Sequence, residues 1–126
     1  MRARKMIRVV IESPYAGNIY QRWRNRRYAR KAMLNSLGRS EAPIASHLLY
    51  TQVLDDGDRT DRAMGINAGL EWLSVADAVV VYIDYGISSG MKSAIKLAIE
   101  LNKPVHYRSL YLSDTTKAIH ESSWSG

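Results

Sequence analysis

Two short loops in the sequence combine small residues with hydroxyl side chains, a composition typical of anion-binding loops. One occupies residues 13–17 and the other residues 88–91, and each follows an apolar segment. Where such a loop opens a helix, free backbone N–H groups and the helix dipole converge on one point and can hold a phosphate. The candidate ligand-binding residues in these loops are Ser13, Tyr15, Ala16, Gly17, Ser88, Ser89, Gly90 and Met91.

Each loop also has a simpler interpretation. Ser88 or Ser89 would serve equally well as an ordinary helix cap, which needs no ligand. Residues 13–17 could form only a tight turn, although Tyr15 is available there to stack on a base or another ring. The second loop is the better phosphate candidate, because it joins hydroxyls and a glycine to the start of a helix.

Three charged residues stand at the ends of strand-like segments. Glu12 and Asp84 should project into one crevice, where carboxylates can bind ribose hydroxyls or act as general base or nucleophile. Asp84 could instead only cap the loop that follows it. Arg108 could neutralise a phosphate, or it could be a surface or interface arginine, and the same two interpretations apply to Arg62 elsewhere in the chain.

The histidines give no case for a metal. His47 lies between apolar neighbours, and we interpret it as a hydrogen-bonded structural residue rather than a catalyst. The three histidines lack the spacing of metal ligands, and the absence of cysteine excludes disulfides, thiolate sites and cysteine nucleophiles. We expect neither a metal nor a cofactor.

Apolar periodicity supplies the elements that would position these residues. Short β-branched runs predict strands at 6–11, 77–84 and 105–107, and helical spacing predicts helices at 18–38, 63–75 and 91–101. Residues 46–50 fit either a short strand or a turn of helix. The alternation favours a three-layer Rossmann-like α/β fold, a parallel sheet with helices on both faces and its ligand site at the carboxyl ends of the strands.

Within the first predicted helix, the apolar residues approximate one face, which we expect to be the buried one. It consists of Ile19, Trp23, Ala29, Met33, Leu34 and Leu37. The same helix carries much of the basic excess, in Arg22, Arg24, Arg26, Arg27, Arg30 and Lys31. These positions spread around a helix, so a solvated face or subunit contact competes with a nucleic-acid-binding module, and we do not expect nucleic acid as the main partner.

Length and charge bound the remaining choices. The chain has 126 residues, enough for one domain at 1–112 followed by a helix or tail at 113–126. Its 18 lysine and arginine residues against 12 aspartate and glutamate give a net charge of +6, which favours anionic partners. No apolar run approaches the roughly 20 residues that span a bilayer, so we expect a cytoplasmic protein without membrane contact.

Three blocks of the sequence resemble a small family of bacterial and phage domains. They are IESPYAG at 11–17, ASHLLYTQ at 45–52 and VYIDYGISSGM at 81–91, and the likeness covers most of residues 6–110. More distantly, the layout is similar to nucleoside 2-deoxyribosyltransferases and deoxynucleotide N-hydrolases. That likeness implies a flavodoxin-like fold, a nucleotide site, and a homodimer or higher homo-oligomer.

One position departs from those enzymes. They carry a nucleophilic glutamate four residues after the loop glycine, and Ala94 stands there in this sequence. A methyl group cannot attack an anomeric carbon, so the leading hypothesis is a non-hydrolytic receptor for a nucleotide, such as an ADP-ribose-type or cyclic signal. In a phage, in the host cytoplasm, such a receptor would be a sponge that counters host immune signalling.

Two alternatives stay open. The chain could be a nucleoside or nucleotide N-glycosidase or deoxyribosyltransferase that uses Glu12 or Asp84 in place of the missing glutamate. It could also be a nucleic-acid-binding module that acts through the basic helix at 22–31.

Overall fold

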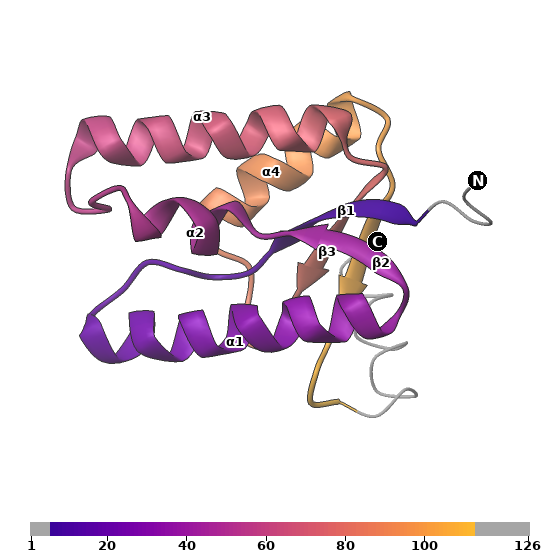
Figure 1. The fold of residues 1–126 in the computed structure, drawn as a ribbon, viewed down its shortest axis with the longest axis horizontal. Coiled ribbons are helices and arrows are strands. Elements are labelled where there is room, and N and C mark those ends of the chain that lie inside the picture. The colour runs from indigo at the N-terminus through magenta and orange to yellow at the C-terminus, as the bar shows by residue number, and fades with distance from the viewer. Residues whose placement is uncertain (1–5, 113–126) are drawn as a thin grey trace.

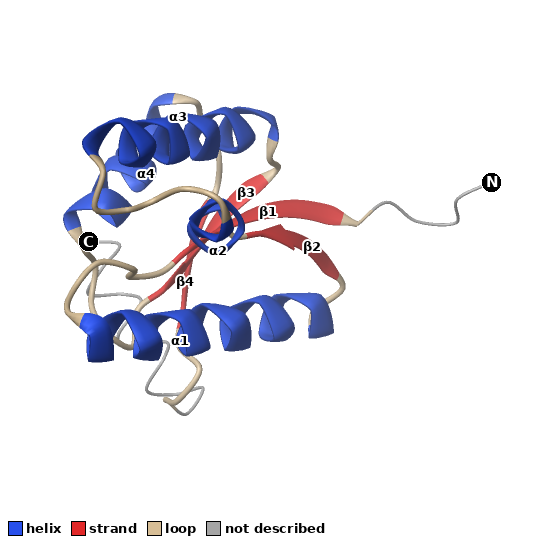
Figure 2. Cartoon of the chain, turned by 60° about the vertical axis from the view of Figure 1, so that its left-hand side comes forward, coloured by secondary structure: helices blue, strands red, loops and turns tan. Residues whose placement is uncertain are grey.

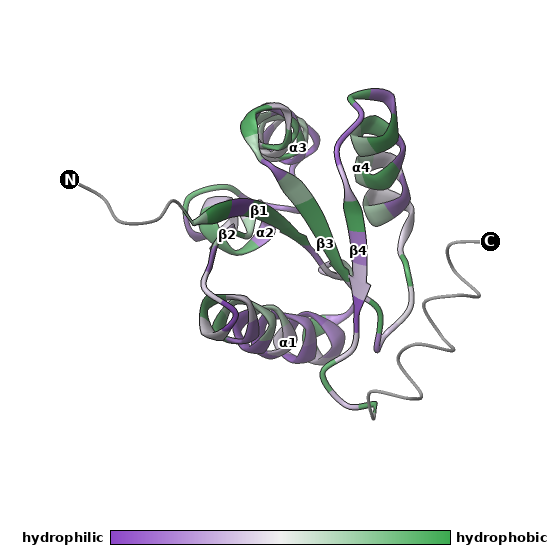
Figure 3. Cartoon of the chain, turned by 90° about the vertical axis from the view of Figure 1, so that its right-hand side faces the viewer, coloured by the Kyte–Doolittle hydropathy of each residue, from purple (hydrophilic) through white to green (hydrophobic). Residues whose placement is uncertain are grey.

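The computed structural model describes residues 6–112, and a four-stranded parallel sheet forms its centre. The strands are β1 (Ile7–Glu12), β2 (Glu41–Ile44), β3 (Ala78–Tyr82) and β4 (Val105–Arg108), in the order β2-β1-β3-β4. All five residues of β3 are buried, as its unbroken apolar sequence predicts for a strand covered on both faces. Figure 3 shows β1 and β3 as the hydrophobic layer between the helices.

Helices cover both faces of this sheet, which confirms the predicted α/β fold (Figure 1). Helix α1 (Ile19–Gly38) lies on one face, and α3 (Arg59–Val75) and α4 (Ser89–Glu100) lie on the other. The short α2 (Ser46–Leu49) and the 3-10 turn η1 (Tyr50–Gln52) follow β2. Figure 2 shows α2 between the two helical layers.

The two halves of the core follow the alternation of side chains along the strands. Val10, Val79 and Val81 pack under α3 and α4, whereas Val9, Ile11 and Val80 pack against α1. Glu12 pairs with Val81 in the β1–β3 register. Within each strand, successive side chains therefore lie on opposite faces of the sheet.

Strand β2 was not predicted, because Pro43 argues against a strand interior. Pro43 pairs with Val9, but β2 lies at the edge of the sheet, where a proline is tolerated. The helical alternative for residues 46–50 is the correct one, since α2 and η1 occupy them.

Capping explains where the long helices begin. Asn18 precedes α1 and accepts a hydrogen bond from the Gln21 N–H at 2.8 Å, while Gln21 accepts one from the Asn18 N–H at 2.9 Å. Gly17 has a φ of +143°, and a Cβ there would lie 2.4 Å from Gln21 Oε1. Glycine is therefore required at this entry to α1.

The predicted buried face of α1 is wrong. Ile19, Trp23, Leu34 and Leu37 are exposed, whereas Ala29 is buried and Met33 is partly buried against the core. The helix turns a more polar set of residues toward the sheet, namely Asn25, Tyr28, Ala29, Ala32 and Ser36. Hydrogen bonds allow this burial, for example from Asn25 Nδ2 to the carbonyl of Tyr15 at 3.2 Å.

The predicted terminal helix or tail at 113–126 lies outside the described residues. Between residues 6 and 112, no helix is both long and apolar enough to cross a membrane.

Candidate functional site

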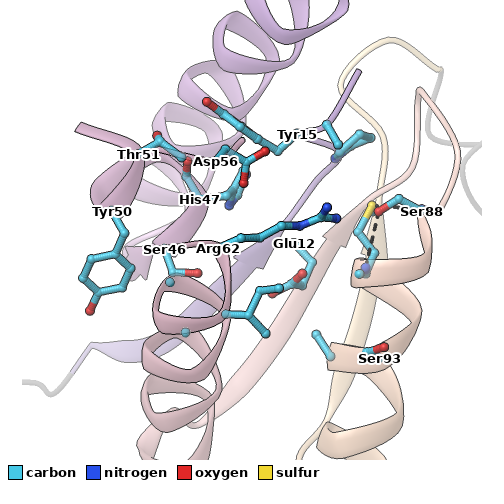
Figure 4. Close-up of a pocket in the computed structure, with 18 of the residues that line it drawn as sticks. Glu12, Tyr15, Ser46, His47, Tyr50, Thr51, Asp56, Arg62, Ser88 and Ser93 are labelled. Atoms are coloured by element: carbon cyan, nitrogen blue, oxygen red, sulfur yellow. Dashed lines mark hydrogen bonds between the residues drawn. The ribbon is translucent and has the colours of Figure 1, made fainter. Parts of the chain in front are cut away.

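A cavity of about 320 Å³ opens at the carboxyl ends of β1 and β3, on the face covered by α3 and α4 (Figure 4). Its wall joins four segments that are distant in sequence: the loop after β1, the α2 turn, α3 and the start of α4. The polar and ionisable residues that line it are Glu12, Ser13, Tyr15, Ser46, His47, Tyr50, Thr51, Asp56, Asp61, Arg62, Ser88, Ser89 and Ser93. Parallel α/β sheets characteristically bind ligands at this end.

Glu12 supplies the carboxyl group at the end of β1. Burial raises its pKa to about 8, so the side chain is mainly protonated at neutral pH. It forms no hydrogen bond or ion pair with another residue of the described chain. A neutral carboxyl group that faces a cavity can both donate and accept a hydrogen bond to a ligand.

Arg62 brings a cation to the same space. Its side chain extends from α3 into the cavity toward the side where Ser88 lies, as Figure 4 shows. Asp58 caps the helix by accepting a hydrogen bond from the Asp61 N–H at 3.0 Å, which fixes the turn before Arg62. The sequence raises Arg62 as an arginine that could contact a phosphate, and its place in the first turns of α3 brings it to the cavity.

The start of α4 lines the opposite wall. Ser88, Ser89, Gly90 and Met91 all border the cavity, and the first N–H groups of a helix have no carbonyl partner within it. Ser88 Oγ accepts a hydrogen bond from the Met91 N–H at 3.3 Å, so the expected helix cap is present. This cap occupies the Met91 N–H and leaves the N–H groups of Ser89 and Gly90 available to an anion.

Ser13 and His47 form a hydrogen-bonded pair beside the β1 loop. Their Oγ and Nε2 atoms are 2.7 Å apart, and Ser13 is buried. Burial lowers the pKa of His47 to about 4, so the imidazole is neutral at physiological pH. The hydrogen bond expected of a structural histidine is present, and His47 also lines the cavity, with the edge of its ring toward Tyr15.

Asp84 does not reach the cavity, contrary to the prediction that it meets Glu12. Its carboxylate lies on the α1 face, where Tyr28 Oη donates to it at 2.5 Å and the Leu110 N–H at 2.9 Å. Ser109 Oγ donates to its other oxygen. Burial opposes ionisation of Asp84, but the hydrogen bonds from Ser109 and Tyr28 outweigh it and hold its pKa below the usual value.

Arg108 is also absent from the cavity wall. Its guanidinium forms a two-pronged ion pair with Glu41, with N–O distances of 2.7 and 2.5 Å. Both side chains are only 12% exposed. The partner that engages Arg108 stands 67 residues away in the sequence, and the pair ties the two edge strands together.

The remaining predicted positions divide between wall and scaffold. Tyr15 and Ala16 line the cavity, and Gly17 serves the entry to α1 instead. Ala94, where the resembling enzymes have a glutamate, is buried and borders the cavity. Among residues 6–112, no group of three or more histidine, cysteine, aspartate or glutamate residues could hold a metal ion.

Solved structures with the same fold include a nucleoside-modifying enzyme. The chain is similar to the 2-deoxyribosyltransferase from Bacillus psychrosaccharolyticus, with a TM-score of 0.59 and 17% sequence identity. The similarity covers 86% of this chain and 78% of that one, and at this identity it establishes the fold alone. No curated protein sequence matches the chain.

The family of the chain follows from its sequence over nearly the whole described region. A family model described as a domain of unknown function (DUF7768) matches residues 7–108, which spans every strand and helix from β1 to β4. The chain therefore belongs to the DUF7768 family.

Proposed function

We propose that the chain binds a phosphorylated nucleotide in the cavity and leaves its glycosidic bond intact. The observation that carries this proposal is that one cavity contains a helix N-terminus, an arginine and a tyrosine. The phosphate would lie at the start of α4 and against Arg62, because both offer donors and positive potential. Tyr15 would stack on the base.

The size of the cavity supports a ligand of this class. A volume of about 320 Å³ is at the lower end of the range for small-molecule sites, and it suits a nucleoside monophosphate or one half of a larger dinucleotide. An ADP-ribose-type or cyclic signal would extend through the open side. Sequestration of such a signal in a host cytoplasm is the biological role that we attach to this proposal.

The chemistry of the wall supports binding rather than cleavage. Ala94 has no group that could attack an anomeric carbon, and Asp84 is engaged on the other face of the sheet. Glu12 is mainly protonated at neutral pH, and a protonated carboxyl group is not a nucleophile.

Self-association belongs to the same proposal. Met64, Trp72 and Val75 share one face of α3, and all three are exposed. An apolar face of this kind is typical of an interface between subunits. We propose that copies of the chain pair through α3, which leaves the mouth of the cavity free.

The test is to incubate the purified protein with a bacterial nucleotide extract, wash and denature it, and identify the released molecules by mass spectrometry. We expect an intact nucleotide in stoichiometric amount. Arg62→Met should lose the phosphorylated ligand, whereas Arg59→Met, at an exposed arginine that does not line the cavity, should retain it. Recovery of a free base with a sugar phosphate would contradict the proposal.

One observation favours a second candidate, an N-glycosidase or deoxyribosyltransferase. The unpaired carboxyl group of Glu12, with a pKa of about 8, has the properties of a general acid that protonates a leaving base. Release of free base from deoxynucleotides that is abolished in Glu12→Gln, with binding retained, would establish this activity.

A further inference from the structure

Helix α1 carries positive charge that nothing in the described chain neutralises. The helix holds six lysine and arginine residues and no aspartate or glutamate. The ion pairs among residues 6–112 are Arg8 with Asp77 and Arg108 with Glu41, so the α1 cations take part in neither. This excess lies on the face of the sheet opposite to α3 and α4, away from the cavity.

The cations of α1 form two rows rather than a uniform coat. Helical spacing places Arg24, Arg27 and Lys31 on one flank of the buried face and Arg22, Arg26 and Arg30 on the other. Within residues 6–112, the cations that lie over aromatic rings all belong to the first row. The charges do spread over both flanks of the helix, as the sequence indicates, and aromatic contacts organise one of these flanks further.

Aromatic rings alternate with the cations on that flank. Arg24 lies over the ring of Tyr85 at 4.1 Å from its centroid, Arg27 over Trp23 at 5.0 Å, and Lys31 over Tyr111 at 5.7 Å. Tyr20 packs against Trp23, with ring centroids 6.1 Å apart. We name this surface the aromatic-cationic strip, which comprises Tyr20, Trp23, Arg24, Arg27, Lys31, Tyr85 and Tyr111.

The rings of the strip are unusually open to solvent. Tyr20 is 68% exposed, Tyr111 54%, Trp23 48% and Tyr85 40%. Each cation occupies one side of a ring, and the exposure of the rings leaves area for another planar group to stack. Large aromatic residues at this exposure, held in place by neighbouring cations, indicate a surface that binds a partner.

We infer that the aromatic-cationic strip binds single-stranded nucleic acid, with bases on the rings and phosphates on Arg24, Arg27 and Lys31. Stacking on aromatic side chains together with a line of cations is the means by which proteins bind single strands without a sequence motif. A duplex hides the faces of its bases, so it would use the cations alone. An acidic peptide would likewise leave the rings without a planar partner.

The carboxylate of Asp84 lies beneath the strip and must be considered with it. It accepts hydrogen bonds from Tyr28, Ser109 and the backbone after Ser109, so its charge is directed into the protein. Three cations therefore face outward over one internal carboxylate. The strip keeps a net positive potential toward an approaching phosphate.

Fluorescence anisotropy tests the inference with labelled oligo(dT) and oligo(rU) of about 12 nucleotides, beside a duplex of equal length, at about 50 mM salt. We expect both single strands to bind more tightly than the duplex. Combined Arg24→Gln, Arg27→Gln and Lys31→Gln should weaken binding about tenfold or more and reduce the slope of log K against log salt by about 2. Stacking of a base on Trp23 should quench the fluorescence of this residue. Trp23→Leu should therefore weaken binding and remove that quenching.

The matched control changes the other row by the same charge. Combined Arg22→Gln, Arg26→Gln and Arg30→Gln should retain affinity within about threefold. Equal losses in the two triple variants, preference for the duplex, or no binding at low salt would overturn the inference. Binding of poly-glutamate as tight as that of oligo(dT) would also overturn it. The same holds if the natural chain binds no oligonucleotide and light scattering shows that the strip variant is a monomer where the natural chain is a dimer.

Discussion

Glu12 ends β1 and Asp84 lies two residues after the neighbouring β3, yet their carboxyl groups lie on opposite faces of the sheet. Glu12 shares the face of Val10 and Val81 and borders the cavity, whereas Asp84 shares the face of Tyr82 and meets α1. Burial at the cavity raises the pKa of Glu12, whereas the hydrogen bonds that Asp84 accepts lower the pKa of Asp84. The two acids should therefore respond to substitution in opposite ways.

Replacing Glu12 with glutamine should make the protein more stable at high pH. The folded-state pKa is raised from 4.5 to about 8, so the folded protein binds more protons than the unfolded chain between these values, and stability falls as pH rises through that window. We expect Glu12→Gln to gain at least about 1 kcal/mol at pH about 9, and little at pH about 4, by urea unfolding. Equal effects at both pH values would contradict the assignment.

Replacing Asp84 with asparagine should have the opposite result. The folded-state pKa is lowered, so the carboxylate contributes stability above its ordinary pKa of 3.8, and this contribution is lost as pH falls toward the lowered value. We expect Asp84→Asn to lose about 2 kcal/mol at neutral pH and to approach the natural chain in acid, by urea unfolding. Nucleotide binding should be unchanged, and its loss would show that Asp84 acts on the cavity.

Removing Arg108 alone should reduce stability more than removing the charges of both Arg108 and Glu41. Arg108→Met leaves a nearly buried carboxylate without its cation, and we expect a loss of about 3 kcal/mol in thermal or urea unfolding. The double variant with Glu41→Gln should recover part of that loss, because no buried charge remains. Additive losses in the double variant would mean that the two side chains do not interact.

Close contact between α3 and α2 should make Gly69 sensitive to a single methyl group. A Cβ there would lie 2.6 Å from Ser46 Oγ and 3.2 Å from Ser46 Cβ, whereas a Cβ at Gly38 meets nothing within 4 Å. Gly38→Ala should therefore stabilise the helix by up to about 1 kcal/mol, and Gly69→Ala should show no such gain. Thermal unfolding checks both variants.

A second substitution separates the contact from helix propensity. Combined Gly69→Ala and Ser46→Gly should be more stable than the sum of the two single changes, because the clash is removed. If Gly69→Ala alone gains as much stability as Gly38→Ala, the close contact between α2 and α3 can relax to admit the added methyl group.

The elements of the fold were predictable where local pattern and packing agree. The unbroken apolar run of β3 and the apolar spacing of Met91, Ala94 and Ala98 in α4 indicate their elements directly. Strand β2 was missed because Pro43 is compatible with a strand only at an edge, and edge position is a property of the whole sheet. The buried face of α1 was missed because Asn25 and Ser36 bury polar atoms through hydrogen bonds that the sequence does not display.

The candidate site was predictable in part, for a similar reason. Glu12, at the end of β1, and Ser88, at the start of α4, reach the cavity because the topology places both at the carboxyl edge of the sheet. Asp84 and Arg108 were placed wrongly because the face of a side chain and its distant partner depend on register, which is fixed by pairing between segments far apart. Arg62 reaches the cavity from the first turns of α3, a placement that depends on tertiary packing of the helix.

The order of the strands has a consequence for how the protein is made. Strand β1 is synthesised before the other strands and can pair with β2 once α1 is complete. Its other partner, β3, comes later, since Val9 pairs with Ala78, 69 residues further along the chain. At about 5–20 residues per second, the ribosome exposes one side of β1 for several seconds before β3 emerges. The cavity also needs the start of α4, so ligand recognition is among the last properties that a nascent chain acquires.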